Sequence, residues 1–332
     1  ETIQYYAEKA IAEGMEKTGA KRIMCLIMDP ETGDVLASAV TPGYDPNNAT
    51  AVDEKDKEKY SKMNNDEKLA YLYSKWRNPI VSDTYEPGSI FKIITAAAAL
   101  EENLVSVEEN FYCPGYVTVE DRRIRCHKTT GHGSQSFVEA IENSCNPVFV
   151  EIGLRLGAQR FYDYFDKFGL FSKTNVDLPG EASTIMHQKD KIGQVELATI
   201  SFGQSFQVSP IQMITTVSSI INGGKRVTPH FAVGVENEKK DIDKIKYKTK
   251  NNICSDETSK TMRQLLEKVV SEGGGNKAYL EGFEIGGKTA TSQTLPRSKN
   301  RYISSFLGFA PVDNPKIILL VIIDNPKGAY YG

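Results

Sequence analysis

The two ends of the chain carry regular hydrophobic patterns that predict a helix and two hairpins. Residues 3–18 repeat apolar side chains at helical spacing, which predicts an amphipathic first helix. Residues 22–28 and 35–40 are apolar runs separated by a turn that contains proline and glycine, so they predict a β-hairpin. Residues 303–310 and 317–323 flank a turn that begins and ends with proline, and they predict a second hairpin.

These hairpins predict one sheet built from both ends of the chain. Residues 283–291 form a further strand candidate, so strands are expected at about residues 20–40 and 283–325. The middle, from about residue 85 to 275, carries mostly helical patterns and should pack on the sheet. We therefore expect an α+β fold, an antiparallel sheet flanked by a mainly helical region, in a single domain over residues 1–332.

Charge and hydropathy restrict the possible partners. The net charge of −3 and the isoelectric point near 6.0 give no reason to expect nucleic acid or an anionic membrane surface as a partner. No run approaches the roughly 20 apolar residues that a membrane helix needs. The chain opens at Glu1 without a leader and stops at Gly332 as though cut, so we expect a soluble domain excised from a longer protein.

The segment that begins at Ser89 is the strongest candidate for chemistry. Glu86-Pro87-Gly88 predicts a chain break, and residues 90–100 are apolar nearly all round, which predicts a buried helix. Lys92 lies on the same helix face as Ser89, and burial would lower the pKa of its amine until it could accept the serine proton. Backbone N–H groups at the helix start could hold an oxyanion. Taken alone, Ser-x-x-Lys more often marks a helix cap followed by a lysine that reaches water.

Two further polar motifs change that balance. Ser144-Cys145-Asn146 precedes Pro147, and Lys288-Thr289-Ala290-Thr291 follows two glycines. In this order the motifs resemble the Ser-x-x-Lys, Ser-x-Asn and Lys-Thr-Gly set of penicillin-recognising acyl-serine enzymes. The whole chain resembles the class B penicillin-binding proteins, and residues 127–146 and 324–328 resemble their sporulation-specific type. Further matching segments are Glu86-Pro87-Gly88-Ser89, Asn143-Ser144-Cys145-Asn146-Pro147, Phe202-Gly203-Gln204, Ser209-Pro210-Ile211-Gln212 and Asn222-Gly223-Gly224.

The resemblance implies a transpeptidase domain related in fold to serine β-lactamases, and a role for the first two motifs. Ser89 would attack the penultimate D-Ala carbonyl of a peptidoglycan stem peptide, with Lys92 as its base. Ser144 and Asn146 would relay the proton and hold the substrate amide. β-Lactams mimic the acyl-D-Ala-D-Ala unit and would acylate Ser89, and the chemistry would need no cofactor.

The third motif would hold the other end of the substrate. The resemblance implies that Lys288 and Thr289 bind the terminal carboxylate and that the backbone N–H groups of Ser89 and Thr291 form the oxyanion hole. Ala290 stands where the family has glycine, and strand alternation turns its methyl to the same side as Lys288, toward the site. We expect Ala290 to crowd the ligand and slow acylation by bulky β-lactams, whereas a tolerated methyl is the competing interpretation.

Three cysteines and one histidine suggest a metal site beside the second motif. Cys113 and Cys126 flank a predicted hairpin over residues 116–125 and should meet at its open end. His132 follows, and Cys145 should point away from the substrate toward this hairpin. Because Cys₃His is an accepted zinc set, we expect a structural zinc that braces the catalytic motif without chemistry of its own.

Different states of these cysteines stay open. Cys113 and Cys126 could form a disulfide in an oxidising compartment, or the thiols could be free and buried. His127 or Asp83 could replace one ligand. Of the remaining cysteines, Cys25 lies in a predicted strand and should belong to the core.

The resemblance leaves rival functions and implies a cellular setting. A serine β-lactamase also needs a deacylating base, and no Glu followed by Leu-Asn at a suitable spacing appears between the second and third motifs. Two more functions compete: a D,D-carboxypeptidase, which uses water as the acceptor, and a non-catalytic scaffold or sensor. As a family member, the domain would work on the extracytoplasmic side of the cell membrane, anchored by an N-terminal helix outside this sequence, beside a glycosyltransferase partner.

Overall fold

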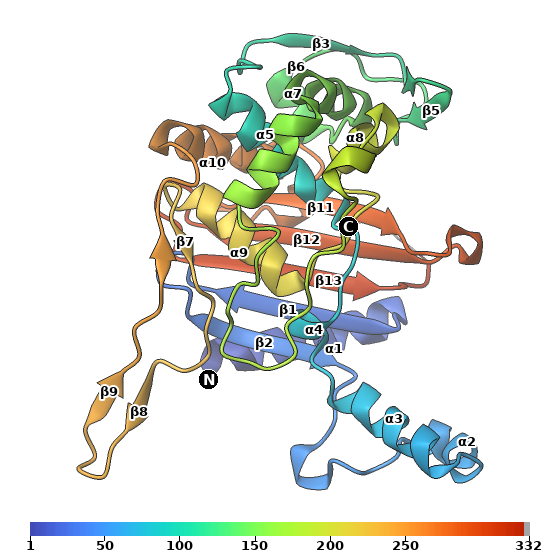
Figure 1. Ribbon diagram of the computed structural model, residues 1–332, viewed down its shortest axis with the longest axis vertical. Helices are drawn as coiled ribbons and strands as arrows, with labels where there is room; N and C mark the ends of the chain where they lie inside the picture. Colours follow the sequence, from blue (N-terminus) through green and yellow to red (C-terminus); the bar gives the residue numbers. More distant parts are fainter. Residues whose placement is uncertain (329–332) are drawn as a thin grey trace.

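The computed structural model describes residues 1–328 and has a five-stranded antiparallel sheet at its centre (Figure 1). The strand order is β11-β12-β13-β1-β2, which confirms the prediction of one sheet built from both chain ends. The strands are β1 (Arg22–Met28), β2 (Val35–Thr41), β11 (Gly286–Gln293), β12 (Tyr302–Ala310) and β13 (Ile317–Asp324). The cut end predicted at Gly332 lies outside the described residues.

The central strands are buried on both faces, which explains their nearly continuous apolar sequences. On one face, Met28 and Leu320 belong to the main hydrophobic core. On the other face, Ile23 belongs to a smaller core with Ile11 of α1 (Thr2–Thr18), the helix predicted from the first pattern. The sheet therefore separates one N-terminal helix from the helical region that contains the candidate site.

The helical region fills the main core. Every residue of α9 is buried, and its polar side chains are satisfied within the protein: Gln212 donates to the Gly169 carbonyl at 2.6 Å and Ser218 to the Pro30 carbonyl at 3.2 Å. The helices are α4 (Pro79–Ser82), α5 (Lys92–Glu101), α6 (Phe137–Glu142), α7 (Asn146–Lys167), α8 (Gln194–Ile200), α9 (Pro210–Ile221) and α10 (Asp256–Ser271).

The middle of the chain is less uniformly helical than predicted. It contains four two-stranded ladders of two to four residues per strand, too short to show a period-2 pattern in the sequence. They are β3 (Asn110–Cys113) with β6 (Gly133–Ser136), β4 (Tyr116–Val119) with β5 (Arg122–Arg125), β7 (Arg226–Val227) with β10 (Thr249–Lys250), and β8 (Gly234–Glu236) with β9 (Ile242–Lys244). The β4–β5 hairpin is the one predicted between Cys113 and Cys126.

Residues 44–78 form a helical arm that reaches away from the sheet (Figure 1). Neither α2 (Lys57–Ser61) nor α3 (Asn65–Trp76) buries a residue. The arm is held by polar contacts such as the indole N–H of Trp76, which donates to the Ala49 carbonyl at 2.8 Å. Across the described part of the chain, no helix has the length and apolar character needed to cross a membrane.

Candidate active site

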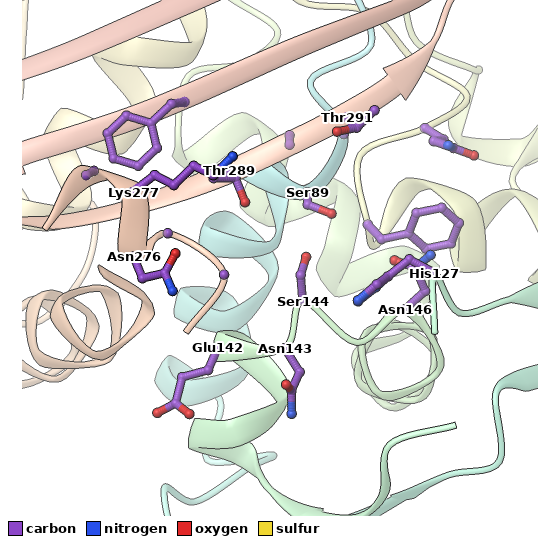
Figure 2. A pocket seen from close by; sticks show the side chains of 18 residues that line it. Ser89, His127, Glu142, Asn143, Ser144, Asn146, Asn276, Lys277, Thr289 and Thr291 are labelled. Atoms are coloured by element: carbon purple, nitrogen blue, oxygen red, sulfur yellow. The ribbon is translucent and has the colours of Figure 1, made fainter. Parts of the chain in front are cut away.

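The three motifs meet at one cleft of about 800 Å³ (Figure 2). Five of the predicted residues line it: Ser89, Ser144, Asn146, Thr289 and Thr291. The two predicted lysines do not line it, because Lys92 and Lys288 are each only 1% exposed. Both amines therefore lie behind the cleft surface. Their surroundings are of low polarity, which strengthens their electrostatic effect on the cleft.

Ser89 is held by a tight turn at the start of α5. It lies in a 3₁₀ turn, η3 (Gly88–Phe91), and not in the α-helix itself as predicted. Gly88 has a φ of +56°, and its N–H donates to the Gly203 carbonyl at 2.9 Å. A Cβ on Gly203 would lie 2.0 Å from the Gly88 carbonyl oxygen, so only glycine fits there. The segment around Gly203 thus fixes the backbone of the candidate nucleophile.

Lys92 connects the first motif to the second. Its amine donates to the Ser144 carbonyl at 2.6 Å, to the Ser144 hydroxyl at 3.1 Å and to the Asn146 amide oxygen at 2.8 Å. Burial lowers the pKa of Lys92 to about 7, against an opposing effect of Cys145 and Cys126. The described residues include no hydrogen bond between Lys92 and Ser89. The Ser144 hydroxyl instead points toward Ser89 (Figure 2), as a relay between them requires.

The second motif is backbone-strained at its serine. Ser144 has a φ of +49°, a conformation that non-glycine residues rarely adopt and that occurs preferentially at functional sites. The turn is fixed at the end of α6, where the Cys145 N–H donates to the Ala140 carbonyl at 2.9 Å. Asn146 opens α7, and its amide N–H donates to the Arg125 carbonyl at 3.1 Å. This bond orients the amide oxygen of Asn146 toward Lys92.

The third motif lies on β11, the edge strand of the sheet. Thr289 and Thr291 line the cleft, whereas Lys288 is buried and its amine donates to the Thr289 carbonyl at 3.3 Å. Burial, followed by repulsion from Lys92, holds the pKa of Lys288 well below its ordinary value. Threonine side chains form the cleft surface along this strand, and the binding of a carboxylate by Lys288 stays a prediction.

The methyl of Ala290 lies on the same buried side of β11 as Lys288, as alternation predicted. It packs against the nucleophile turn, because a Cβ built on Gly88 would lie only 3.4 Å from the Ala290 Cβ. Ala290 also lines the cleft and is 4% exposed. The departure from the family motif thus lies directly beside the residue that precedes Ser89.

The predicted cysteine and histidine cluster is assembled. The ligand atoms of its four members all lie within 4.8 Å of one another, a spacing that could hold one metal ion. A hydrogen bond with the Cys145 thiol holds the pKa of Cys126 far below its ordinary value, so one thiolate forms readily, as metal binding requires. The members are Cys113, Cys126, His132 and Cys145.

The clustered set contains neither Asp83 nor His127, the two residues predicted as possible replacements. All five cysteines are free and buried, including Cys25 in the core beneath α1. Asp83 forms ion pairs with Arg22 at 3.1 Å and with Arg77, and it is not one of the four clustered residues. His127 Nδ1 lies 3.9 Å from the Cys126 sulfur, yet its side chain lines the cleft (Figure 2).

The cleft has further walls that the sequence analysis did not assign. Glu142 and Asn143 precede the second motif, and residues 274–278 form a loop before β11 (Figure 2). A Cβ on Gly273 would lie 3.0 Å from the Glu142 Cα, so the loop packs closely on this wall. The run of three glycines from Gly273 to Gly275 was the available signal, since consecutive glycines often permit close backbone approach.

This geometry agrees with the comparison to known families. Residues 23–332 match the family model of the penicillin binding protein transpeptidase domain, and the chain belongs to this family. It is 40% identical to Stage V sporulation protein D of Bacillus subtilis, over 98% of this chain and 49% of that protein. It is 28% identical to PbpB of Mycolicibacterium smegmatis, over 99% of this chain and 50% of that protein. The chain thus spans about half the length of these curated relatives.

Solved structures confirm the fold class. Penicillin binding protein 3 of Mycobacterium tuberculosis, in complex with aztreonam, superimposes with a TM-score of 0.85 at 27% identity, over 98% of this chain and 71% of that one. The same protein in complex with ampicillin gives the same TM-score. The predicted family and the predicted α+β architecture are therefore both correct.

Proposed function

We propose that this domain is a peptidoglycan D,D-transpeptidase that cross-links stem peptides through an acyl-enzyme on Ser89. The observation that carries the proposal is the buried amine of Lys92, hydrogen-bonded to Ser144 and Asn146 behind the nucleophile turn. A buried lysine without a carboxylate partner is unfavourable for stability, and such groups concentrate where a proton must be exchanged. We take residues 1–332 as one functional domain.

The residues support an acyl transfer in two steps. The Ser89 hydroxyl gives its proton to Lys92 through the Ser144 hydroxyl, while its oxygen bonds to the penultimate D-Ala carbonyl carbon. Backbone N–H groups of Ser89 and Thr291 hold the oxyanion, and one such donor contributes about two to three orders of magnitude in rate. The proton passes to the leaving D-Ala amine as the peptide bond breaks. An acceptor amine then attacks the acyl-enzyme, loses a proton by the same route and frees Ser89.

The third motif would hold the substrate carboxylate. The Thr289 hydroxyl lines the cleft and would donate a hydrogen bond to the carboxylate. Lys288 lies directly behind it, and an anion in the cleft would favour its charged form. Asn146 would hold the amide of the bound peptide. β-Lactams, which present a carboxylate and a strained amide in the same arrangement, would acylate Ser89.

The cysteine and histidine cluster would hold a structural zinc. Three buried sulfur donors and one imidazole nitrogen are a zinc set, and their close spacing supports a single ion. When bound, zinc would fix Cys145 and the hairpin that carries Cys126. Because Cys145 stands between Ser144 and Asn146, this brace would keep the proton relay aligned, and the chemistry itself would use no metal.

The cellular setting is inferred from relatives. The Bacillus subtilis relative is named a sporulation protein, which supports cell-wall synthesis during sporulation over a vegetative role. We place the domain on the extracytoplasmic side of the membrane, within a longer chain anchored by an N-terminal helix. A glycosyltransferase that supplies new glycan strands would be its partner.

Mass spectrometry of the intact protein after exposure to a penicillin tests the proposal. We expect a lasting adduct of one ligand per chain, lost in Ser89→Ala and retained in Ser134→Ala, which alters an exposed serine of β6 that does not line the cleft. Rapid turnover of the adduct would indicate a β-lactamase, and release of D-Ala without amine transfer would indicate a carboxypeptidase. A folded chain that forms no adduct would contradict the proposal in favour of a scaffold or sensor.

A further inference from the structure

The β4–β5 hairpin presents a basic face to solvent. In its register Tyr116 pairs with Arg125 and Thr118 with Arg123, so these four exposed side chains share one face. Ile124 points the other way and packs against the main core. The outer face therefore combines two guanidinium groups, an aromatic ring and a hydroxyl, and all four side chains are exposed.

The two arginines are available for an anion. The Arg123 guanidinium lies 3.7 Å from the centre of the Tyr116 ring, a stacking that fixes the side chain and leaves its N–H groups at the edge. Within residues 1–328, no carboxylate lies within ion-pair distance of Arg123 or Arg125, whereas Arg122 on the opposite face is 3.6 Å from Asp121. We call Tyr116, Arg123 and Arg125 the basic platform.

The base of the β4–β5 hairpin adjoins the catalytic cleft. The Arg125 carbonyl accepts a hydrogen bond from the Asn146 amide, and Asn146 in turn accepts one from Lys92. His127, two residues beyond Arg125, lines the cleft (Figure 2). A peptide that leaves the cleft past His127 would therefore meet the base of the hairpin first.

Charge complementarity indicates which peptide this is. The carboxylate of the donor peptide is matched by Thr289 and Lys288 on β11, and Figure 2 shows that strand across the cleft from His127 and Asn146. Cross-linking brings in a second peptide of the same anionic chemistry, whose amine must reach the acyl-enzyme. We propose that the basic platform binds carboxylates of this acyl-acceptor peptide. This inference rests on the proposed transpeptidase function.

Binding to a chain that cannot turn over tests the basic platform directly. In Ser89→Ala protein, fluorescence anisotropy would compare a labelled acidic peptide with its fully amidated twin. We expect each exposed ion pair to strengthen binding of the acidic peptide about threefold. Arg123→Gln/Arg125→Gln, which loses both pairs, should therefore bind this peptide about tenfold more weakly. The amidated peptide should bind equally well to the Ser89→Ala protein with and without the two arginine substitutions. Raising the salt should remove the preference for the acidic peptide, because exposed charges are screened.

The control is Arg122→Gln, which removes an arginine from the other face of the same hairpin and should bind the acidic peptide like the parent. A transfer assay separates acceptor from donor. With a neutral thioester donor, Arg123→Gln/Arg125→Gln should raise KM for an acidic amine acceptor about tenfold and leave KM for an amidated acceptor unchanged.

Three outcomes would overturn the inference: unchanged binding of the acidic peptide, equal loss for both peptides, or an effect on the donor alone. Labelling of the unmodified chain by a fluorescent penicillin separates the two levels. If the chain is labelled but the arginine substitutions do not weaken binding of the acidic peptide, only this inference is refuted. If the chain is not labelled, the proposed function itself is refuted.

Discussion

At the scale of single residues, Lys92 and Ser144 carry the strongest physical constraints. Lys92 is a buried amine whose hydrogen-bond partners in the described part of the chain are neutral oxygens, and Ser144 has left-handed backbone dihedrals without being glycine. Both are unfavourable for folding, by about 1–3 kcal/mol for the backbone strain alone. The two residues lie next to each other. The rest of the domain must therefore stabilise an arrangement that is unfavourable for folding and that serves the proposed proton transfer.

The pH dependence of acylation follows from Lys92. Its pKa is lowered to about 7 by burial, and only the neutral amine can accept the Ser89 proton. The acylation rate should therefore be high above pH 7 and fall as the pH drops below it, by about tenfold per unit because one proton is involved. Stopped-flow labelling by a fluorescent penicillin between about pH 5.5 and 8.5 measures this. A rate that stays constant down to pH 5.5 would exclude Lys92 as the base.

Ala290 offers a second test at this scale. Its methyl packs beside Gly88, so Ala290→Gly should relax the turn that carries Ser89. We expect acylation by bulky β-lactams to accelerate about five- to tenfold, equivalent to about 1 kcal/mol of relieved crowding. A small penicillin should respond less. Second-order acylation rates for both ligands provide the measurement, and unchanged rates would mean that the methyl is simply tolerated.

The sequence predicted which residues gather at the cleft but not how deep each one lies. Ser89, Ser144 and Thr289 could be assigned from motifs, because short spacing within a motif fixes its local geometry. The depth of Lys288 could not, since it depends on how β11 packs against the helices. Glu142 and His127 were missed for the same reason: their place in the wall is set by neighbours that are distant in sequence.

At the scale of elements, the cysteine and histidine cluster joins four short pieces of the chain. It connects β3, the end of β5, the segment before β6 and the turn before α7. These ladders are short, and two-stranded ladders are marginally stable without support. A shared ion would make them one unit, and that unit includes the turn on which Ser144 and Asn146 lie.

Metal analysis of Cys145→Ser examines this unit. We expect the bound zinc to fall from about one ion per chain to none, and the melting temperature to drop by at least about 3 °C, equivalent to about 2 kcal/mol in a domain of this size. The acylation rate should fall as well, because the relay loses its brace. Cys254→Ser is the matched control: it changes another buried cysteine outside the cluster and should keep its metal. Equal metal content in both variants would contradict the site.

Elements were predictable where a pattern runs over several turns or alternations. The strand pairs at both chain ends and α1 have six or more residues of regular pattern, and they were found with nearly correct bounds. The strand predicted to start at Phe283 begins only at Gly286. Phe283 lies outside it because its N–H turns back to donate to the Leu280 carbonyl. The arm over residues 44–78 was not foreseen, since helices that bury no residue leave little apolar periodicity.

At the scale of the whole molecule, the second core between α1 and the sheet supports the strand order from the side opposite the cleft. Ile11 is 4% exposed within this core, and Ile11→Ala should lower the free energy of unfolding by about 2–5 kcal/mol. Ile3, which is 40% exposed on the same helix, provides the comparison, and Ile3→Ala should change stability by no more than about 0.5 kcal/mol. Urea unfolding curves decide this, and similar losses for both variants would mean that α1 contributes little through burial.

The strand order also governs when the enzyme can come into being during synthesis. Ser89, Lys92 and Ser144 all precede β11 in the sequence, and β11 is joined to the earlier strand β1 only through β12 and β13. A growing polypeptide therefore carries its nucleophile before it has the wall that would let it recognise an ester, a lactam or a peptide. Reactivity appears only when the final strands emerge, so a nascent or prematurely terminated chain cannot be trapped by an antibiotic.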